Sequence, residues 1–429
     1  MSESCKHAES LVAAARAAGA RSAEALVVES VSRRCEGAGG TVSQAADVRA
    51  HLRVVLQDGR VGVVDGAVDA AALVAAAMAS ADLSVGFPGP APRLDVPTMG
   101  LGILDPRQEG LDDEQRASVI EDAKDDCVGV DANVVPGAFV YEEVVQERGF
   151  ASTAAGVVGE RSTRYRLTGA ARLRGAGIDA VGSITSRNFA EVASKPLGVE
   201  LARRAVLFGS SAPLPAVPVP LAFAPAVIAG LLPRVARAFR AELVDLGDSF
   251  LAGRLGRGFS GSELHIVDDA GMPGGYATRA FDDRGVPPVP VNLVREGTVG
   301  GLYQGVASAG MADVRPSGHE TADGSAWLGN LVVRAGNRSR NMVFPELGTL
   351  VLVEQLQAVE RFDLRTGELV LQVVPVRYES TEAVGVCGVQ RLVLSVDELF
   401  GQVTQVLNDH VRLGVVDTPT WVVEGPWFG

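Results

Sequence analysis

Histidine is scarce in this chain of 429 residues, and the five histidines lie far apart. They are His7, His51, His265, His319 and His410, and no two lie within forty residues of each other. A zinc hydrolase most simply holds its metal with two histidines one helical turn apart and a nearby glutamate. The sequence therefore excludes a local zinc motif of that kind, and we expect no metal in this chain.

His319 and Glu320 begin like such a motif, but Asp323 and Gly324 stand where the second histidine would be needed. The flanking Pro-Ser-Gly and Asp-Gly-Ser tripeptides predict a loop instead of a helix. We interpret His319 as a solvated loop histidine, with a metal ligand as the alternative.

His265 and Asp268 lie on a predicted strand that runs into a turn, and together they could form half of a metal or catalytic site. Side chains alternate faces along a strand, so a structural histidine is favoured. Cys387 lies between Gly385 and Gly388, with no positive charge close in sequence to lower its pKa, and we interpret it as inert.

Other catalytic signatures are missing. The sequence holds no G-x-S-x-G elbow and no Gly-Lys pair of a phosphate loop. A G-x-G-x-x-G run at Gly256, Gly258 and Gly261 follows a predicted helix and precedes a strand, the reverse of the dinucleotide-binding order. We interpret it as a flexible loop.

The four cysteines are scattered without a C-x-x-C pair, which is typical of free thiols in a reducing compartment. The first ten residues lack a secretory signal. The long uncharged stretch between Ser211 and Arg234 carries six prolines, too many for a membrane-spanning helix. We expect a cytoplasmic protein with no membrane contact.

Lysine is nearly absent, at three residues, and the formal net charge is −13. Such a surface repels phosphate backbones, so nucleic acid is excluded as a direct partner.

Hydrophobic residues make up 47% of the chain, enough for a sizeable core, and the length favours two domains.

Periodicity predicts an N-terminal α/β domain over 1–212. We expect helices at 8–20, 69–81, 112–127 and 197–207, the last with Arg203 and Arg204 facing water. Strands are expected at 25–33, at 48–64 as a hairpin around Asp58-Gly59, and as an antiparallel set at 138–145, 149–158 and 162–167.

A proline run at 213–220 predicts a stiff connector, followed by a β-rich C-terminal domain over 221–429. Helices are expected at 224–246 and 396–407. Strands are expected at 263–267, 289–295, 298–303, 329–334, 350–356, 369–376 and 389–394, with hairpin turns at 295–297 and 365–367. The predicted class is α+β, with the second domain dominated by antiparallel sheet.

One run in the second half carries a specific resemblance. SFLAGRLG (249–256) is followed by IVDDAGMPGG (266–275), FDDRGVP (281–287) and VNLVREGTVGGLY (291–303). These segments, in this order, resemble the PmbA/TldE branch of the TldD/PmbA, or modulator of DNA gyrase, metallopeptidase family. Weaker likeness extends over most of the chain, with Arg148 where the family usually has Asn. The loops at 304–328 and 374–390 depart from the family pattern.

The resemblance implies a heterodimer in which a TldD-like partner carries a helical zinc site. This chain would then be the non-catalytic subunit that completes the cavity, acting on small peptides or a pathway-specific amide. The departing loops would fit a specialised biosynthetic role, such as processing of a natural product. A stand-alone hydrolase using His265, His319 or Cys387, or a regulatory or scaffold protein, are the alternatives.

Four residues are candidates for the cavity or the substrate site: Arg279, Asp282, Asp283 and His319. The two aspartates precede a Gly-Val-Pro turn, and the favoured interpretation is that they cap it. The alternative is that they line or brace the cavity. Arg279 could bind a substrate carboxylate, but an ion pair with Asp282 or Asp283 is slightly favoured. We expect no catalytic residue in this chain.

Overall fold

The structure is a computed structural model that describes residues 1–37, 41–81, 96 and 100–425. Three β-sheets form its framework. The first sheet belongs to the N-terminal half, and the other two belong to the C-terminal half. The segment 86–97, whose prolines and glycines predict a loop, lies almost wholly outside the described residues.

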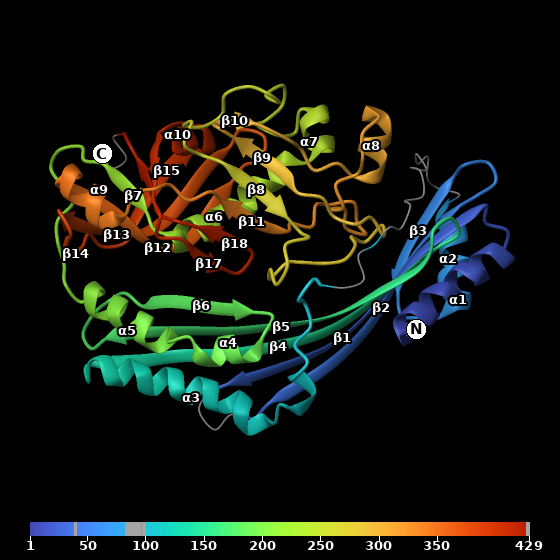
Figure 1. Cartoon of the computed structure of the whole chain (residues 1–429), viewed down its shortest axis with the longest axis horizontal. Coiled ribbons are helices and arrows are strands. Elements are labelled where there is room, and N and C mark those ends of the chain that lie inside the picture. The colour runs from blue at the N-terminus through green and yellow to red at the C-terminus, as the bar shows by residue number, and fades with distance from the viewer. Residues whose placement is uncertain (38–40, 82–95, 97–99, 426–429) are drawn as a thin grey trace.

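The N-terminal sheet has the order β3-β2-β1-β4-β5-β6, and every neighbouring pair is antiparallel. Its strands are β1 (Ser22–Glu36), β2 (Ser43–Val55), β3 (Val61–Gly66), β4 (Val134–Ser152), β5 (Gly156–Leu173) and β6 (Ala180–Ser186). The helical segments of this half are α1 (Glu3–Ala17), α2 (Ala70–Ala81), η1 (Gln108–Gly110), α3 (Asp113–Val130), α4 (Phe189–Ser194) and α5 (Leu197–Phe208). Helices α1 and α2 lie at one end of the long strands, and α3 to α5 lie at the other (Figure 1).

The hairpin around Asp58-Gly59 is confirmed, with Gly59 at a φ of +89° that glycine adopts without strain. The helix expected at 8–20 instead begins at Glu3, because the Ser2 side chain caps it by accepting from the N–H of Cys5. Helix α3 begins at a capping box made by Asp112 and Gln115.

The three strands expected between 138 and 167 are in fact the two long strands β4 and β5. Gly149 does not interrupt β4. A Cβ there would lie 2.4 Å from the backbone nitrogen of Cys5, so the glycine instead allows α1 to approach the strand closely. The expectation that Arg204 faces water is wrong as well, because its side chain is half-buried and donates to the carbonyl of Val181.

The C-terminal half holds two sheets. One has the order β10-β9-β8-β11-β18-β17; the other has the order β14-β13-β12-β7-β19-β16, with β15 paired to β13. Their strands are β7 (Leu221–Phe223), β8 (Ile266–Asp269), β9 (Val291–Arg295), β10 (Thr298–Val299), β11 (Asn330–Val333), β12 (Thr349–Phe362), β13 (Glu368–Glu379), β14 (Glu382–Val386), β15 (Gln390–Ser395), β16 (Val403–Val406), β17 (Val411–Leu413), β18 (Val416–Thr418) and β19 (Trp421–Val423). All pairings between these strands are antiparallel except β11–β18 and β12–β7, so the expected α+β class with an antiparallel C-terminal part is confirmed.

The helical segments of this half are α6 (Pro225–Ala236), η2 (Arg237–Phe239), α7 (Ala241–Leu246), α8 (Val306–Ala312), α9 (Arg340–Leu347) and α10 (Val396–Gly401). Helix α6 shares the largest apolar core with both sheets. The single helix expected at 224–246 is broken at Arg240, whose backbone is extended and bridges to Tyr303. The helix expected at 396–407 ends at Gly401, because Val403–Val406 pairs with β19.

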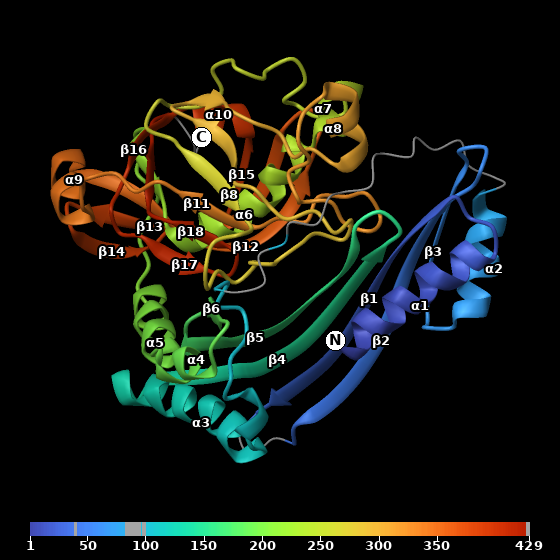
Figure 2. The same cartoon turned by 45° about the vertical axis from the view of Figure 1, so that its right-hand side comes forward.

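The C-terminal sheets lie over the β4–β6 end of the N-terminal sheet (Figures 1 and 2). The proline run at 213–220 holds neither helix nor strand, bends at 216–217, and joins α5 to β7. The division of the chain into two domains at that run stays a prediction. Across the described residues, every helix is too short or too polar to span a bilayer.

Candidate functional site

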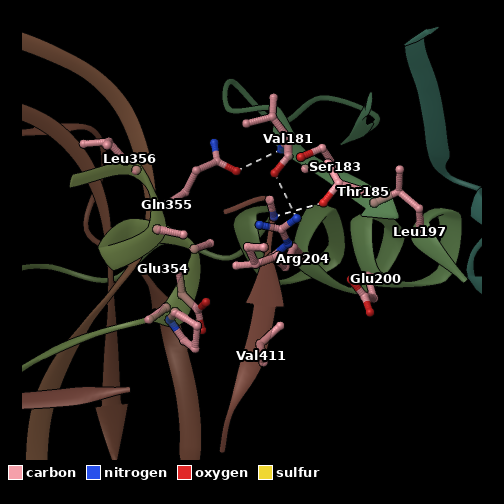
Figure 3. Close-up of a pocket in the computed structure, with 18 of the residues that line it drawn as sticks. Val181, Ser183, Thr185, Leu197, Glu200, Arg204, Glu354, Gln355, Leu356 and Val411 are labelled. Carbon is pink, nitrogen blue, oxygen red and sulfur yellow. Dashed lines mark hydrogen bonds between the residues drawn. The ribbon is translucent and has the colours of Figure 1, made fainter. Parts of the chain in front are cut away.

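A cleft with a volume of about 830 Å³ lies between the two halves of the chain. Its walls come from β5, β6 and α5 on one side and from α6, β12 and the β17–β18 hairpin on the other (Figure 3). Ligand sites are typically concavities of this size, placed where two parts of a fold meet. The cleft is therefore the candidate site for a bound molecule.

The side chain of Gln355 on β12 joins the two walls. Its Oε1 accepts from the N–H of Val181 at 2.8 Å, and its Nε2 donates to the carbonyl of Asp179 at 2.9 Å. Arg204 on α5 donates to the carbonyl of Val181 at 2.9 Å (Figure 3). A further bond joins the N–H of Gly414 to the Thr185 hydroxyl at 3.0 Å. These bonds hold strand β6 at a fixed position in the cleft wall.

Charged groups of both signs line the cleft. Arg340 forms an ion pair with Asp409 at 2.7 Å and also donates to the Thr420 hydroxyl. Burial lowers the pKa of the Arg204 guanidinium, against the opposing effect of Glu354. Burial likewise raises the pKa of the lining residue Tyr276. The cleft thus offers hydrogen-bonding and charged anchors to a polar ligand.

The described lining of this cleft includes neither histidine nor cysteine. Elsewhere among the described residues, no three His, Cys, Asp or Glu side chains lie close enough together to hold a metal ion. The cleft can bind and orient a ligand through these groups. It does not bring together the ligands that zinc requires.

The four residues proposed from the sequence lie away from this cleft, in a buried polar cluster where β4 and β5 meet the loops at 270–290 and 317–330. Arg279 is 1% exposed and donates to the carbonyls of Gly318, Trp327 and Leu328. Arg279 does not form the proposed ion pair with Asp282 or Asp283. Its guanidinium is also not free to bind a substrate carboxylate. Burial lowers the pKa of Arg279 to about 10, so it remains charged at neutral pH.

Asp282 caps its turn, as the favoured interpretation holds. Its Oδ1 accepts from the N–H groups of Arg284 and Val286, both at 2.9 Å, and its Oδ2 accepts from the N–H of Glu320 at 3.0 Å. Burial raises the pKa of Asp282 to about 6, and the nearby Glu320 acts in the same direction, against the N–H bonds and Arg279.

Asp283 joins three segments instead of capping the turn. Its Oδ1 accepts from Arg148 at 2.6 Å, and its Oδ2 accepts from the N–H of Ala322 at 2.9 Å. Arg148 also forms an ion pair with Glu160 at 2.7 Å and donates to the carbonyl of Phe281. This set of contacts ties β4 and β5 of the N-terminal half to the C-terminal loops.

Glycine at position 285 allows that turn to pack against the N-terminal sheet. Gly285 has a φ of +71°, and a Cβ there would lie 2.4 Å from the ring of Phe150 on β4. Arg284 beside it forms ion pairs with Glu24 on β1 and with Glu320, both at 3.0 Å. The FDDRGVP segment is thus a structural junction between the two halves.

His319 is not the solvated loop residue expected from the sequence, because it is only 2% exposed. Its Nδ1 lies 2.9 Å from the carbonyl of Ser317, which can only accept, so Nδ1 carries a proton. Its Nε2 lies 3.5 Å from Oδ1 of Asp268, whose Oδ2 accepts from the Tyr303 hydroxyl at 2.6 Å. Burial favours the neutral form of Asp268, but the nearby His319 and the hydrogen bonds from the Tyr303 hydroxyl and the Gly329 N–H prevail and lower its pKa.

The Asp268–His319 pair does not fit a zinc ion. Only one oxygen and one nitrogen face each other there, and the next side chain, Tyr303, is already bonded to the carboxylate. Asp268 is instead partnered with His319, and His265 lies elsewhere, half-buried beside the strand. Burial raises the pKa of the Cys387 thiol, which disfavours the reactive thiolate.

Sequence reasoning missed the residues that line the cleft, including Arg204, Gln355 and Arg340. These side chains come from α5, β12 and α9, which are far apart in sequence. Strand β6 was also missed. In this short segment Val181, Ser183 and Thr185 recur at every second residue, and that period of two is the signal that could have indicated strand β6.

Comparisons with known proteins agree with this fold. Residues 217–427 match the PmbA/TldA metallopeptidase C-terminal domain. A metalloprotease of Synechocystis sp. is 37% identical over 65 residues, which is 15% of this chain and only 14% of that protein.

Solved structures match over nearly the whole chain. A protein of Thermotoga maritima described as a modulator of a DNA gyrase has a TM-score of 0.87 at 19% identity, covering 98% of both chains. A similarly described protein of Bacteroides thetaiotaomicron has a TM-score of 0.85 at 17% identity, covering 99% of this chain and 98% of that one. TldE of Thermococcus kodakarensis has a TM-score of 0.84 at 18% identity, covering 98% of this chain and 99% of that one. The solved structures share the fold of this chain, and the matched C-terminal domain together with the motifs at 249–303 makes the chain a member of the PmbA/TldD family.

Proposed function

We propose that this chain is the TldE-like, non-catalytic subunit of a cytoplasmic two-subunit metallopeptidase. A TldD-like partner would supply the zinc ion, the activated water and the general base. This chain would supply part of the wall of the substrate chamber. The substrates would be small peptides or an amide of one particular pathway.

The observation that carries this proposal is the chemistry of the cleft between the two halves. It has the volume and the polar anchors of a binding site, yet its described walls hold neither histidine nor cysteine. The likeness to TldE of Thermococcus kodakarensis over 98% of this chain supports the same assignment.

The burial of three residues proposed from the sequence also supports the non-catalytic role. Arg279, Asp282 and His319 are 1–2% exposed and are engaged by the main chain or by other buried groups. Groups placed in this way brace a structure and do not meet a substrate. A specialised biosynthetic role would draw on the departing loops at 304–328 and 374–390.

The test is reconstitution with a TldD-like chain from the same source. Hydrolysis of short peptides is measured for each chain alone and for the equimolar mixture, and only the mixture should be active. Replacing the metal-site glutamate of the partner should abolish turnover, whereas Cys387→Ala and His265→Ala in this chain should leave most of the rate.

Activity of this chain without a partner would favour the alternative of a stand-alone hydrolase. A stable complex that shows no turnover in any mixture would favour the regulatory or scaffold alternative. Size-exclusion chromatography of each mixture separates a failure to assemble from a failure to catalyse.

A further inference from the structure

We propose that Arg164, Arg166 and Tyr276 form a binding site for the carboxylate groups of a small ligand on the β5 side of the cleft. Arg166 and Tyr276 line the cleft, and Arg164 lies two residues before Arg166 on strand β5. The inference goes beyond the proposed function, because this chain would bind the carboxylates whether or not a partner supplies a metal.

The two arginines lie on the same face of the N-terminal sheet. Side chains alternate along a strand, so Arg164 and Arg166 point to one face and Tyr165 between them points to the other. Tyr165 is fully buried in the core that β4 and β5 share with helices α3 and α5. Arg164 and Arg166 therefore point away from these helices, toward the cleft and the C-terminal half.

The acidic residues close to these two arginines are already paired with other cations. Glu142, the cross-strand neighbour of Arg166, forms an ion pair with Arg34. Glu160 on β5 forms an ion pair with Arg148. Within the part of the chain that the structure describes, the guanidinium groups of the two arginines take neither a hydrogen-bond partner nor an ion-pair partner. Both groups are therefore available to an anion from outside the chain.

Arg187 holds Tyr276 beside the two arginines. Its guanidinium is buried and donates to the carbonyls of Gly275 at 3.1 Å and Thr278 at 2.7 Å, on either side of Tyr276 in the sequence. It also donates to the carbonyl of Thr163 on β5 at 3.0 Å. Tyr276 is half-buried, and no described residue forms a hydrogen bond with its hydroxyl. This hydroxyl is a third donor for a bound carboxylate.

The positive charges lie close enough together to act on one another. Burial raises the pKa of Tyr276, and the charges of Arg164, Arg166 and Arg187 oppose that rise. Burial, and then the charge of Arg164, lower the pKa of Arg187 to about 9. The whole chain carries a formal charge of −13, so this cluster is a local exception to its surface. A bound anion would relieve the repulsion between the arginines.

The geometry of the donors favours carboxylate over phosphate. A guanidinium is planar and can donate two parallel hydrogen bonds to one carboxylate. Phosphate sites usually add main-chain N–H groups from a helix N-terminus or a glycine-rich loop, whereas all three groups here belong to side chains. Residues two apart on a strand are separated by about 7 Å, which suits one small ligand with two carboxylates.

The test is isothermal titration calorimetry of the full-length chain with glutarate, a five-carbon dicarboxylate. Saturable binding is expected, and glutaramide, the neutral diamide of the same length, should not bind. Arg166→Gln and Arg164→Gln should each weaken glutarate binding at least about tenfold, and Tyr276→Phe about fivefold, because hydrogen bonds that involve two charged groups are the stronger ones. Arg166 is exposed, so its replacement should leave the melting temperature unchanged.

The matched control is Arg161→Gln. Arg161 lies on the same strand but on the opposite face, and its removal changes the net charge equally. This variant should bind glutarate like the unaltered chain. Equal weakening by Arg161→Gln and Arg166→Gln would overturn the inference, because the overall charge and not a local site would then govern binding.

A competition experiment identifies the source of the carboxylates. A pentapeptide with blocked ends and two glutamates carries the same groups as glutarate on a peptide. Displacement of glutarate by this pentapeptide would support a site for acidic peptides, and failure to displace it would support a site for free dicarboxylates. Inorganic phosphate that binds more tightly than glutarate would overturn the carboxylate assignment.

The absence of saturable glutarate binding at millimolar concentration, both by the chain alone and by its complex with a TldD-like partner, would also overturn the inference. Binding is measured without turnover. An active mixture that does not bind glutarate therefore refutes only this inference, whereas glutarate binding with an inactive mixture refutes only the proposed function.

Discussion

The guanidinium of Arg148 on strand β4 lies 4.5 Å from the ring centroid of Trp327, in the loop before β11. Arg279 lies at the same distance from the same ring. Arg148 also forms ion pairs with Glu160 and Asp283. One buried cation therefore joins the N-terminal sheet to two loops of the C-terminal half, and these contacts hold the two halves together.

Replacing Arg148 should lower the free energy of unfolding. Arg148→Met leaves the carboxylates of Glu160 and Asp283 without their partner, and removing one member of a buried ion pair typically costs about 3–5 kcal/mol of unfolding free energy. Urea denaturation followed by circular dichroism measures the change. The control is Arg161→Met on strand β5, whose exposed ion pair with Glu109 should contribute little. A loss below about 1 kcal/mol for Arg148→Met would contradict the structural role.

Asp282 should make stability depend on pH. Its pKa is raised to about 6 in the folded chain, above the ordinary aspartate value of 3.8, so the folded state binds the proton more tightly between these values. The stabilisation is complete below about pH 4 and is lost as the pH rises through about 6. We expect the stability difference between the unaltered chain and Asp282→Asn to fall by about 2 kcal/mol from pH 4 to pH 7. Urea midpoints at four pH values measure it, and a constant difference would refute the prediction.

Gln355 should control the local stability of strand β6. Gln355→Leu removes the acceptor for the N–H of Val181 and the donor to Asp179. The amide of Val181 should then exchange with deuterium about fivefold faster, since one hydrogen bond contributes about 1 kcal/mol. The amide of Ile184, which points toward β5, serves as the internal control and should change little. Equal acceleration at both amides would indicate general destabilisation instead.

Zinc should not stabilise the isolated chain. The buried histidine–carboxylate pair of His319 and Asp268 offers two ligand atoms, fewer than a structural zinc site requires, and no group of three potential ligands lies together in the described part of the chain. Elemental analysis of the purified chain should find far less than one zinc per chain, and a chelator should leave the melting temperature unchanged. Stoichiometric zinc that is lost in a His319→Gln variant would contradict both this prediction and the proposed non-catalytic role.

The sequence by itself determined the features that depend on local chemistry. Asp58-Gly59 predicted its hairpin because glycine adopts the required positive φ, and Asp282 predicted its turn cap because its side chain reaches the N–H groups just beyond it. The ordered motifs between 249 and 303 indicated the family, which the matched C-terminal domain confirms.

Only the tertiary structure decided where helices break and which groups are buried. The helix expected through Arg240 ends because the backbone there pairs with Tyr303, more than sixty residues later in the chain. His319 is flanked by residues typical of a loop, yet it is enclosed by contacts with Asp268 and Tyr303. The cleft depends on Gln355 reaching strand β6 across 174 residues of sequence. Contacts at such separations leave no local pattern, because they depend on how whole sheets pack and not on the residues beside them in the chain.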